Sequence, residues 1–311
     1  MGSLKLRTIR DRHLRTARAL DVFRWMYHFE EGSAQMVLKA LKAYQNSDGG
    51  FGHGLEPDLG GASSSPIASA VAARLLVELG LPPLAQSMVR PLQHYLEKTQ
   101  SAQGTWPVFG PVRPQGLHAP WWDVDEKALF WGWNPSAELA AFYLRTKGFD
   151  EGTCARCEAA LQRALEDLLT PTHDLTAHEC VSLAQALETL EKTPWAFSPE
   201  AVTALAKRIR AHLPDSFTHD DTQEYLPHLN WFLNGRENPL YPELREAAEA
   251  YGPYLESTVT KDGVWLPNWQ WGDAKIPPSV LRDWQGVLTL ENMRYLQGFR
   301  PDPILKNQLD S

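Results

Sequence analysis

A glycine-rich segment early in the chain combines a histidine with two carboxylates, which are residue types that carry acid–base chemistry or bind metal ions. His53, Glu56 and Asp58 lie within the segment 50–58. Glycine lets a backbone approach a ligand closely, and loops on a rigid scaffold commonly hold functional residues. We therefore expect these side chains to act as acid, base or metal ligands, in a mixed nitrogen/oxygen site if His118 joins them. The alternative is that they cap helix ends and hold the loop.

A second segment joins acidic residues to tryptophans. It contains His118, Trp121, Trp122, Asp123, Asp125, Glu126, Trp131 and Trp133. Clustered carboxyl groups have shifted pKa values when they are shielded from water, so this segment is a candidate catalytic site. The alternative is a solvated acidic turn ahead of a helix that begins near Asn134–Pro135.

A late aromatic cluster provides a candidate binding surface. Trp269 and Trp271 lie two residues apart, with Trp265 and Trp284 nearby in sequence. Flat aromatic faces stack on sugars or cover isoprene units, so we expect Trp269 and Trp271 to bind substrate. Packing in the core is the alternative.

Two further groups have the residue types of metal sites. Cys154, Cys157, His178 and Cys180 could supply zinc ligands, but their spacing on predicted helices points the side chains in different directions. The acidic run 220–224 is better explained by a helix cap and first-turn acids. We therefore expect no cofactor, and magnesium or zinc is the alternative.

Most of the chain carries the signals of helices separated by proline- and glycine-rich loops. Ser65–Pro66, Asn134–Pro135 and Ser198–Pro199 each place a capping side chain before a proline at the first helical position. The pattern predicts helices over residues 5–28, 33–45, 66–79, 83–98, 135–146, 152–169, 173–191, 199–213, 221–233, 242–257 and 279–296. No run alternates apolar and polar residues long enough to form a sheet, so the fold class is all-α.

Three loops share a repeated pattern. Gln45–Phe51 and Gln100–Trp106 run from glutamine through glycine to an aromatic residue. Thr260–Trp265 has the glycine and the aromatic residue but lacks the glutamine. The pattern resembles the glutamine–tryptophan repeat of squalene–hopene cyclases and related prenyltransferase-like α/α toroids. The resemblance, together with the helical-pair period, predicts a single α/α toroid domain over residues 1–311 with about six helical hairpins.

The acidic segment resembles the Asp-x-Asp-Asp motif of protonation-initiated terpene cyclases, with Glu126 in place of the last aspartate. The resemblance implies that Asp125 is the proton donor and that Asp123 and Glu126 are its neighbours. Protonation of an alkene needs an unusually strong acid in a cavity that excludes water. The indoles of Trp121, Trp122, Trp131 and Trp133 would then stabilise carbocations through their π faces.

Composition and charge exclude several classes of protein. The chain of 311 residues is 43% hydrophobic and 22% charged with a net charge of −8, which excludes a disordered chain and argues against a nucleic-acid partner. No apolar run approaches the roughly 18 residues that span a bilayer. The absence of a signal-peptide pattern and the presence of only three cysteines predict a cytoplasmic protein.

The first 18 residues are basic, in contrast to the acidic chain as a whole. They carry Lys5, Arg7, Arg10, Arg12, Arg15 and Arg18 against one acidic residue, Asp11. An amphipathic basic helix can rest on an anionic membrane surface, so we expect a peripheral membrane contact here. A solvated face of the first toroid helix is the alternative.

Three functions are consistent with these patterns. The resemblance favours a terpenoid-cyclase-like or prenyl-substrate enzyme that holds a small apolar isoprenoid in an aromatic-lined central cavity. The first alternative is a glycan-active (α/α)6 enzyme that pairs Glu56 or Asp58 with Asp123 or Asp125 across a cleft. The second alternative is a toroid that binds a ligand or partner without catalysis.

Overall fold

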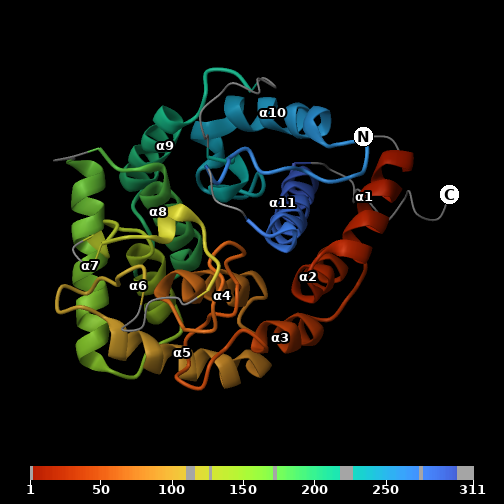
Figure 1. The fold of residues 1–311 in the computed structure, drawn as a ribbon. Helices are drawn as coiled ribbons and strands as arrows, with labels where there is room; N and C mark the ends of the chain where they lie inside the picture. Colours follow the sequence, from red (N-terminus) through yellow and green to blue (C-terminus); the bar gives the residue numbers. More distant parts are fainter. Residues whose placement is uncertain are drawn as a thin grey trace. The chain divides into compact units, whose positions relative to one another are not determined.

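The chain is all-helical, as the sequence predicts. The computed structural model describes residues 3–109, 116–125, 128–170, 174–217, 227–272 and 276–299. Of these residues 61% are helical, in eleven α-helices and a few short 3-10 turns, and no strand occurs among them (Figure 1). None of the described helices is both long and apolar enough to cross a membrane. The chain divides into two compact units, unit 1 (residues 1–40 and 210–311) and unit 2 (residues 41–209).

Unit 2 alternates amphipathic helices with helices that are buried on nearly every side. It contains α4 (Pro66–Glu78), α5 (Gln86–Thr99), α6 (Ser136–Arg145), α7 (Glu151–Leu169), α8 (Ala177–Leu190) and most of α9 (Pro199–His212). α6 contacts α4, α5, α7 and α8, and every side chain from Ser136 to Leu144 is buried. In α7, Cys157, Ala160, Leu161, Ala164 and Leu168 form one buried stripe at helical spacing. α6 is therefore the centre of the core of unit 2.

Unit 1 is organised around its last helix. It contains α1 (Ser3–Thr16), α2 (Ala19–Phe29), most of α3 (Ala34–Lys42), the 3-10 turn η4 (Leu229–Trp231), α10 (Tyr241–Thr258) and α11 (Pro278–Gly298). α11 contacts α1, α2, α10 and η4. The buried guanidinium of Arg24 on α2 pairs with Glu291 on α11 at 2.6 Å. A buried charge is tolerated only when it is paired, so this ion pair fixes α2 against α11.

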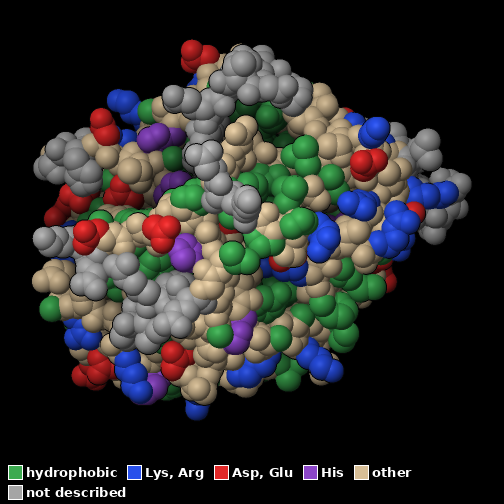
Figure 2. Space-filling model, in the orientation of Figure 1, with side chains coloured by type: hydrophobic (Ala, Val, Ile, Leu, Met, Phe, Trp, Pro, Cys, Tyr) green, Lys and Arg blue, Asp and Glu red, His purple; other side chains and the backbone are tan. Residues whose placement is uncertain are grey.

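The basic N-terminal region is two helices instead of the one predicted over residues 5–28. Arg18 has an extended backbone between α1 and α2, and its side chain pairs with Asp21 in the first turn of α2 at 2.7 Å. Lys and Arg side chains gather over α1 (Figure 2). Its apolar stripe, which includes Leu6 and Ile9, is buried within unit 1. Membrane contact through the remaining basic face stays a prediction.

Other helix boundaries differ from the predicted ones for local reasons. The predicted helix over 221–233 lies partly outside the described residues, and residues 229–231 form only the turn η4. The helix predicted from residue 173 begins at Ala177, because Thr176 and Glu179 form a capping box there. The Asn134–Pro135 peptide is cis, and Asn134 does not cap α6, which begins at Ser136. The other two predicted caps are confirmed, since Ser65 and Ser198 accept hydrogen bonds from Ala68 N and Ala201 N.

The three repeated turns follow α3, α5 and α10 and share one hydrogen-bond pattern. A backbone N–H donates to the carbonyl oxygen four residues later: Asn46 to Gly50 at 2.9 Å, Ser101 to Thr105 at 2.8 Å, and Thr260 to Val264 at 3.0 Å. The glycines Gly49, Gly104 and Gly263 have φ values of 92°, 82° and 78°. The aromatic residue that follows donates its backbone N–H to a hydroxyl on the next buried helix: Phe51 to Ser69, Trp106 to Ser136, and Trp265 to Thr289. The same local geometry thus ends three helices and connects each turn to the next buried helix by a hydrogen bond.

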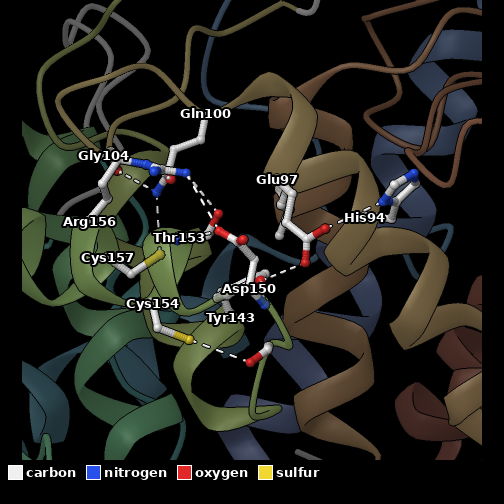
Figure 3. Close-up of polar contacts among 12 residues, drawn as sticks. His94, Glu97, Gln100, Gly104, Tyr143, Asp150, Thr153, Cys154, Arg156 and Cys157 are labelled. Atoms are coloured by element: carbon white, nitrogen blue, oxygen red, sulfur yellow. Dashed lines mark hydrogen bonds and ion pairs between the residues drawn. The ribbon is translucent and has the colours of Figure 1, made fainter.

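In the first two turns a glutamine also ties the turn to the next amphipathic helix. Gln45 Nε2 donates to Gly49 O at 2.9 Å and to Met88 O on α5 at 3.0 Å. Gln100 Oε1 accepts from Arg156 Nε on α7 at 2.7 Å (Figure 3). The third turn has Val259 at this position, so this link is missing there.

The same region of unit 2 contains a polar network that joins α5, α6 and α7 (Figure 3). Tyr143 on α6 donates its hydroxyl to Glu97 on α5 at 2.6 Å. Asp150 donates its backbone N–H to the Tyr143 oxygen and caps α7 by accepting from Thr153 N at 2.6 Å. Burial and the Glu97 hydrogen bond both raise the pKa of Tyr143, so the hydroxyl remains a donor near neutral pH.

Replacing Gly104 with alanine tests how closely the turn packs. A Cβ at Gly104 would overlap the carbonyl oxygen of Arg156, whereas a Cβ at Gly80, which also has positive φ, would meet no atom within 4 Å. Gly80→Ala should cost about 1 kcal/mol from backbone strain alone. Gly104→Ala should cost about 1–3 kcal/mol more, because a neighbouring helix must also move. Urea unfolding of both variants measures the difference, and equal losses would contradict the close packing.

Candidate functional site

The two segments that the sequence singles out in unit 2 lie side by side. Gly60 N donates to Leu117 O at 3.0 Å, and Ala119 N donates to Asp58 O at 2.9 Å. Leu59 and His118 form an isolated β-bridge. A Cβ on Gly60 would overlap the Leu117 carbonyl oxygen, so only glycine allows this approach. We call the loops 52–62 and 116–125, together with Trp131, the two-loop site.

Asp58 holds the two loops together from inside. It is only 2% exposed, and its Oδ1 accepts a hydrogen bond from Trp122 Nε1 at 2.9 Å. The ring of Trp131 stacks on the ring of Trp122 with an interplanar angle of 11° and a centroid distance of 5.4 Å. Asp58 is therefore placed to position an aromatic pair, and it does not face solvent as an acid or base would.

His118 is held by two hydrogen-bond acceptors. Its Nδ1 lies 2.7 Å from Gly116 O, and its Nε2 lies 2.9 Å from Asp123 Oδ1. Both nitrogens can donate only in the imidazolium form. The hydrogen bond to Asp123 accordingly raises the pKa of His118, although partial burial opposes the shift. The protonated form of His118 thus makes an ion pair with Asp123 at the edge of the site.

The carboxylates with a predicted role in proton donation lie at the surface. Asp123 is 74% exposed, Asp125 is also exposed, and Glu126 lies outside the described residues. An acid strong enough to protonate an alkene needs surroundings that exclude water. The described part of the loop leaves Asp123 and Asp125 open to solvent.

His53 belongs to a network that the sequence analysis did not identify. Its Nε2 lies 2.8 Å from Asn46 Oδ1, while Asn46 Nδ2 donates to Ser64 Oγ at 2.9 Å. Ser64 Oγ in turn donates to Asp48 Oδ1 at 2.7 Å. Asn46 and Asp48 belong to the first repeated turn. The polar residues of that turn could have indicated in the sequence that it interacts with the His53 loop. Glu56, on the same loop as His53, is half-buried.

The tryptophans of the second segment have two different placements. Trp121 is 38% exposed and Trp131 is half-buried, so both present part of a ring to solvent. Trp133 is buried and donates its indole N–H to Asp167 Oδ2 at 3.0 Å. Its backbone N–H donates to Glu179 Oε1 at 3.1 Å. Trp133 therefore fixes the 131–134 turn from inside the unit.

Glu179 also supports the site, and the sequence analysis did not identify it, although it lies between the zinc-ligand candidates His178 and Cys180. Besides Trp133 N, its carboxylate accepts hydrogen bonds from the backbone N–H and the hydroxyl of Thr176, both at 2.9 Å. Gly132 has positive φ, and a Cβ there would overlap the Glu179 carboxylate. One side chain thus caps α8 and fixes the turn that carries Trp131.

Trp269 and Trp271 belong to unit 1, where they form a cluster of their own. Trp269 contacts Trp271, Trp284 and His228 through edge-on ring packing. His228 also contacts Trp231. The sequence analysis did not identify His228 and Trp231 as part of this cluster, because both lie in a segment that was predicted to be a helix.

Cys157 and Cys180 are small buried side chains, and Cys154 is half-buried. Burial raises the pKa of Cys157 and of Cys180 to about 12, so both remain thiols at neutral pH. A zinc ligand must be a thiolate. Within the described ranges no group of three or more His, Cys, Asp or Glu side chains is arranged to hold a metal ion. The acidic run 220–224 lies outside the described residues.

The ion pair at His118 predicts a pH dependence. A raised pKa in the folded state means that the pair stabilises the loop fully below about pH 6.5. The stabilisation is lost as the pH rises through the raised pKa that His118 has in the folded state. Asp123→Asn should lower the pKa of His118 measured by NMR titration, while Asp125→Asn should leave it in place. An equal effect of both substitutions would contradict a specific pair.

The Asp58–Trp122 hydrogen bond predicts a difference between two substitutions. Asp58→Ala leaves the indole N–H buried without its acceptor, which should cost about 1–3 kcal/mol of unfolding free energy. Asp58→Asn keeps a carbonyl acceptor and should cost less. Urea unfolding and near-ultraviolet circular dichroism report the stability and the Trp122 environment. If alanine is tolerated as well as asparagine, the proposed anchoring of Trp122 is wrong.

Comparison with known proteins does not indicate a family or a function for the chain. No family model, curated protein or solved structure matches the chain. The functional conclusion therefore depends on the residues and contacts described above.

Proposed function

We propose that residues 1–311 form a single α/α toroid domain, and the glycine turns support this arrangement. Gly49 after α3 packs on α5, and Gly104 after α5 packs on α7, so each turn contacts the next amphipathic helix along the chain. Gly263 after α10 packs on the backbone of α1 at Ile9. A last repeat that has the first helix as its neighbour is expected for hairpins arranged in a ring.

We propose that this toroid binds a saccharide at the two-loop site. The observation that carries the proposal is the stack of Trp131 on Trp122, which Asp58 fixes from behind. A half-exposed indole held in this way offers a flat apolar face to a sugar ring. Asp123 on the neighbouring loop is an exposed acceptor for hydroxyl groups, and pockets commonly combine such aromatic walls with a few polar groups.

A terpenoid-cyclase-like activity is the second candidate, and the repeated turns favour it because they carry the resemblance to cyclase toroids. Cyclisation initiated by Asp125 would require a dry apolar cavity, whereas Asp125 is exposed. A linear isoprenoid hydrocarbon also offers no hydroxyl group to the carboxylates of the loop. The exposed polar rim therefore favours a saccharide ligand over an isoprenoid.

A binding experiment tests this choice. Purified protein is titrated by isothermal calorimetry with cellotetraose, maltotetraose, xylotetraose and chitotetraose, and separately with farnesol and farnesyl diphosphate. At least one tetrasaccharide should bind, and Trp131→Ala should weaken that binding by about ten-fold or more, because an aromatic anchor is lost. Trp195→Ala is the matched control, since Trp195 is a half-buried indole of unit 2 outside both loops.

The same samples separate binding from catalysis. Product analysis of each bound saccharide, with wild type and Asp125→Asn, identifies a glycan-active enzyme if cleavage depends on this carboxylate. Mass spectrometry of a squalene incubation identifies a cyclase if a cyclised product disappears in Asp125→Asn. Binding of isoprenoids alone, or equal effects of Trp131→Ala and Trp195→Ala, would reject the saccharide proposal.

A further inference from the structure

We propose that unit 1 carries a second saccharide-binding site, formed by four tryptophans around His228. The ligand class follows from the function proposed for the two-loop site, but the residues are different. Trp231 comes from η4, Trp269 and Trp271 come from the loop after α10, and Trp284 comes from α11. Three segments that are distant in sequence thus bring their indoles to one place.

Trp269 is the centre of this cluster. Its ring centroid lies 4.9 Å from that of Trp284 and 6.1 Å from that of Trp271, with interplanar angles of 86° and 67°. The His228 ring lies 6.2 Å from Trp269 and 5.1 Å from Trp231. Edge-on packing of this kind restricts the orientation of each ring and sets neighbouring rings at steep angles to one another.

Burial distinguishes these four indoles from a tryptophan that serves the core of unit 1. Trp265 is 3% exposed, and its Nε1 donates to Leu255 O at 3.0 Å, which satisfies the whole side chain within the fold. The four tryptophans around His228 are all only half-buried. Half-burial leaves part of each indole accessible to a ligand, as a binding surface lined by aromatic side chains requires.

His228 supplies a hydrogen-bonding group at the base of the cluster. It is nine-tenths buried, and its Nδ1 lies 3.1 Å from the hydroxyl of Tyr251. Its Nε2 is buried and makes no hydrogen bond of ordinary geometry. Burial lowers the pKa of His228 to about 4, although the nearby Asn268 side chain opposes the shift. The imidazole is therefore neutral at pH 7, with one nitrogen that donates and one that accepts.

A second buried polar atom without a hydrogen bond of ordinary geometry lies two residues along the chain. Asn230 donates its amide to Asn292 Oδ1 at 2.7 Å, but its own Oδ1 is buried without a partner. Buried polar atoms are almost always satisfied, so His228 Nε2 and Asn230 Oδ1 together point to a ligand with hydrogen-bonding groups. The hydroxyl groups of a sugar ring can donate or accept, and the ring also has an apolar face for the indoles.

The test separates the histidine's two nitrogens. His228→Asn retains a group near the Nδ1 position that can bond Tyr251, but it has no polar atom at the position of Nε2. This variant should keep its unfolding free energy close to that of wild type while binding the tetrasaccharide about five- to ten-fold more weakly at this site. Trp269→Ala should weaken binding by about ten-fold or more. NMR of the wild-type imidazole should show a shift of the Nε2 resonance on addition of the tetrasaccharide.

Failure of this proposal can be distinguished from failure of the first one. Calorimetry of wild type should show two sites for the tetrasaccharide, of which Trp131→Ala removes one and His228→Asn weakens the other. Binding that is unchanged in His228→Asn and Trp269→Ala, with a stationary Nε2 resonance, would overturn the second site. Binding that is unchanged in Trp131→Ala but lost in Trp269→Ala would overturn the two-loop site alone, and no binding in any protein would overturn both.

Discussion

The close approach of a glycine turn to a neighbouring helix is the constraint on which both units depend. Gly49, Gly104 and Gly263 each leave their helix with positive φ and lie against the backbone of another amphipathic helix. The aromatic residue two positions later is buried and donates its backbone N–H to a hydroxyl of the next buried helix. A side chain at the glycine would separate the helices, and loss of the hydroxyl would leave a buried N–H without its acceptor.

The candidate site of unit 2 is a consequence of that scaffold. The loop 52–62 follows directly from the first turn, and Trp131 precedes α6, which is the buried centre of the unit. Asp58 and Glu179 each use a buried carboxylate to fix a tryptophan or its turn. Buried carboxylates are costly unless they accept several hydrogen bonds, so these two residues also restrict the geometry of the site. The exposed Trp121 and Asp123 and the half-buried Trp131 remain accessible to a ligand.

The two aromatic sites differ in their chemistry. In the two-loop site the ring of His118 contacts the exposed carboxylate of Asp123, which raises the pKa of His118. In unit 1 the ring of His228 is buried and bonded to Tyr251, and burial lowers its pKa. The protonated form is therefore favoured in one unit and the neutral form in the other, because one ring contacts a carboxylate and the other is removed from water.

The sequence by itself determined the helical class, most helix positions and the repeated turns, because these depend on local periodicity, caps and glycine conformation. It also grouped residues of the two loops in one candidate site and gave Asp58 and Asp125 possible acid–base roles, which depend on how far each side chain is shielded from water. Only the tertiary structure decided that Asp58 is buried against Trp122 while Asp123 and Asp125 are exposed. Burial and hydrogen-bond partners come from segments distant in sequence, so residue type and spacing alone cannot specify them. For the same reason the contribution of His228, whose neighbours are Tyr251, Trp231 and Trp269, emerged only from the folded chain.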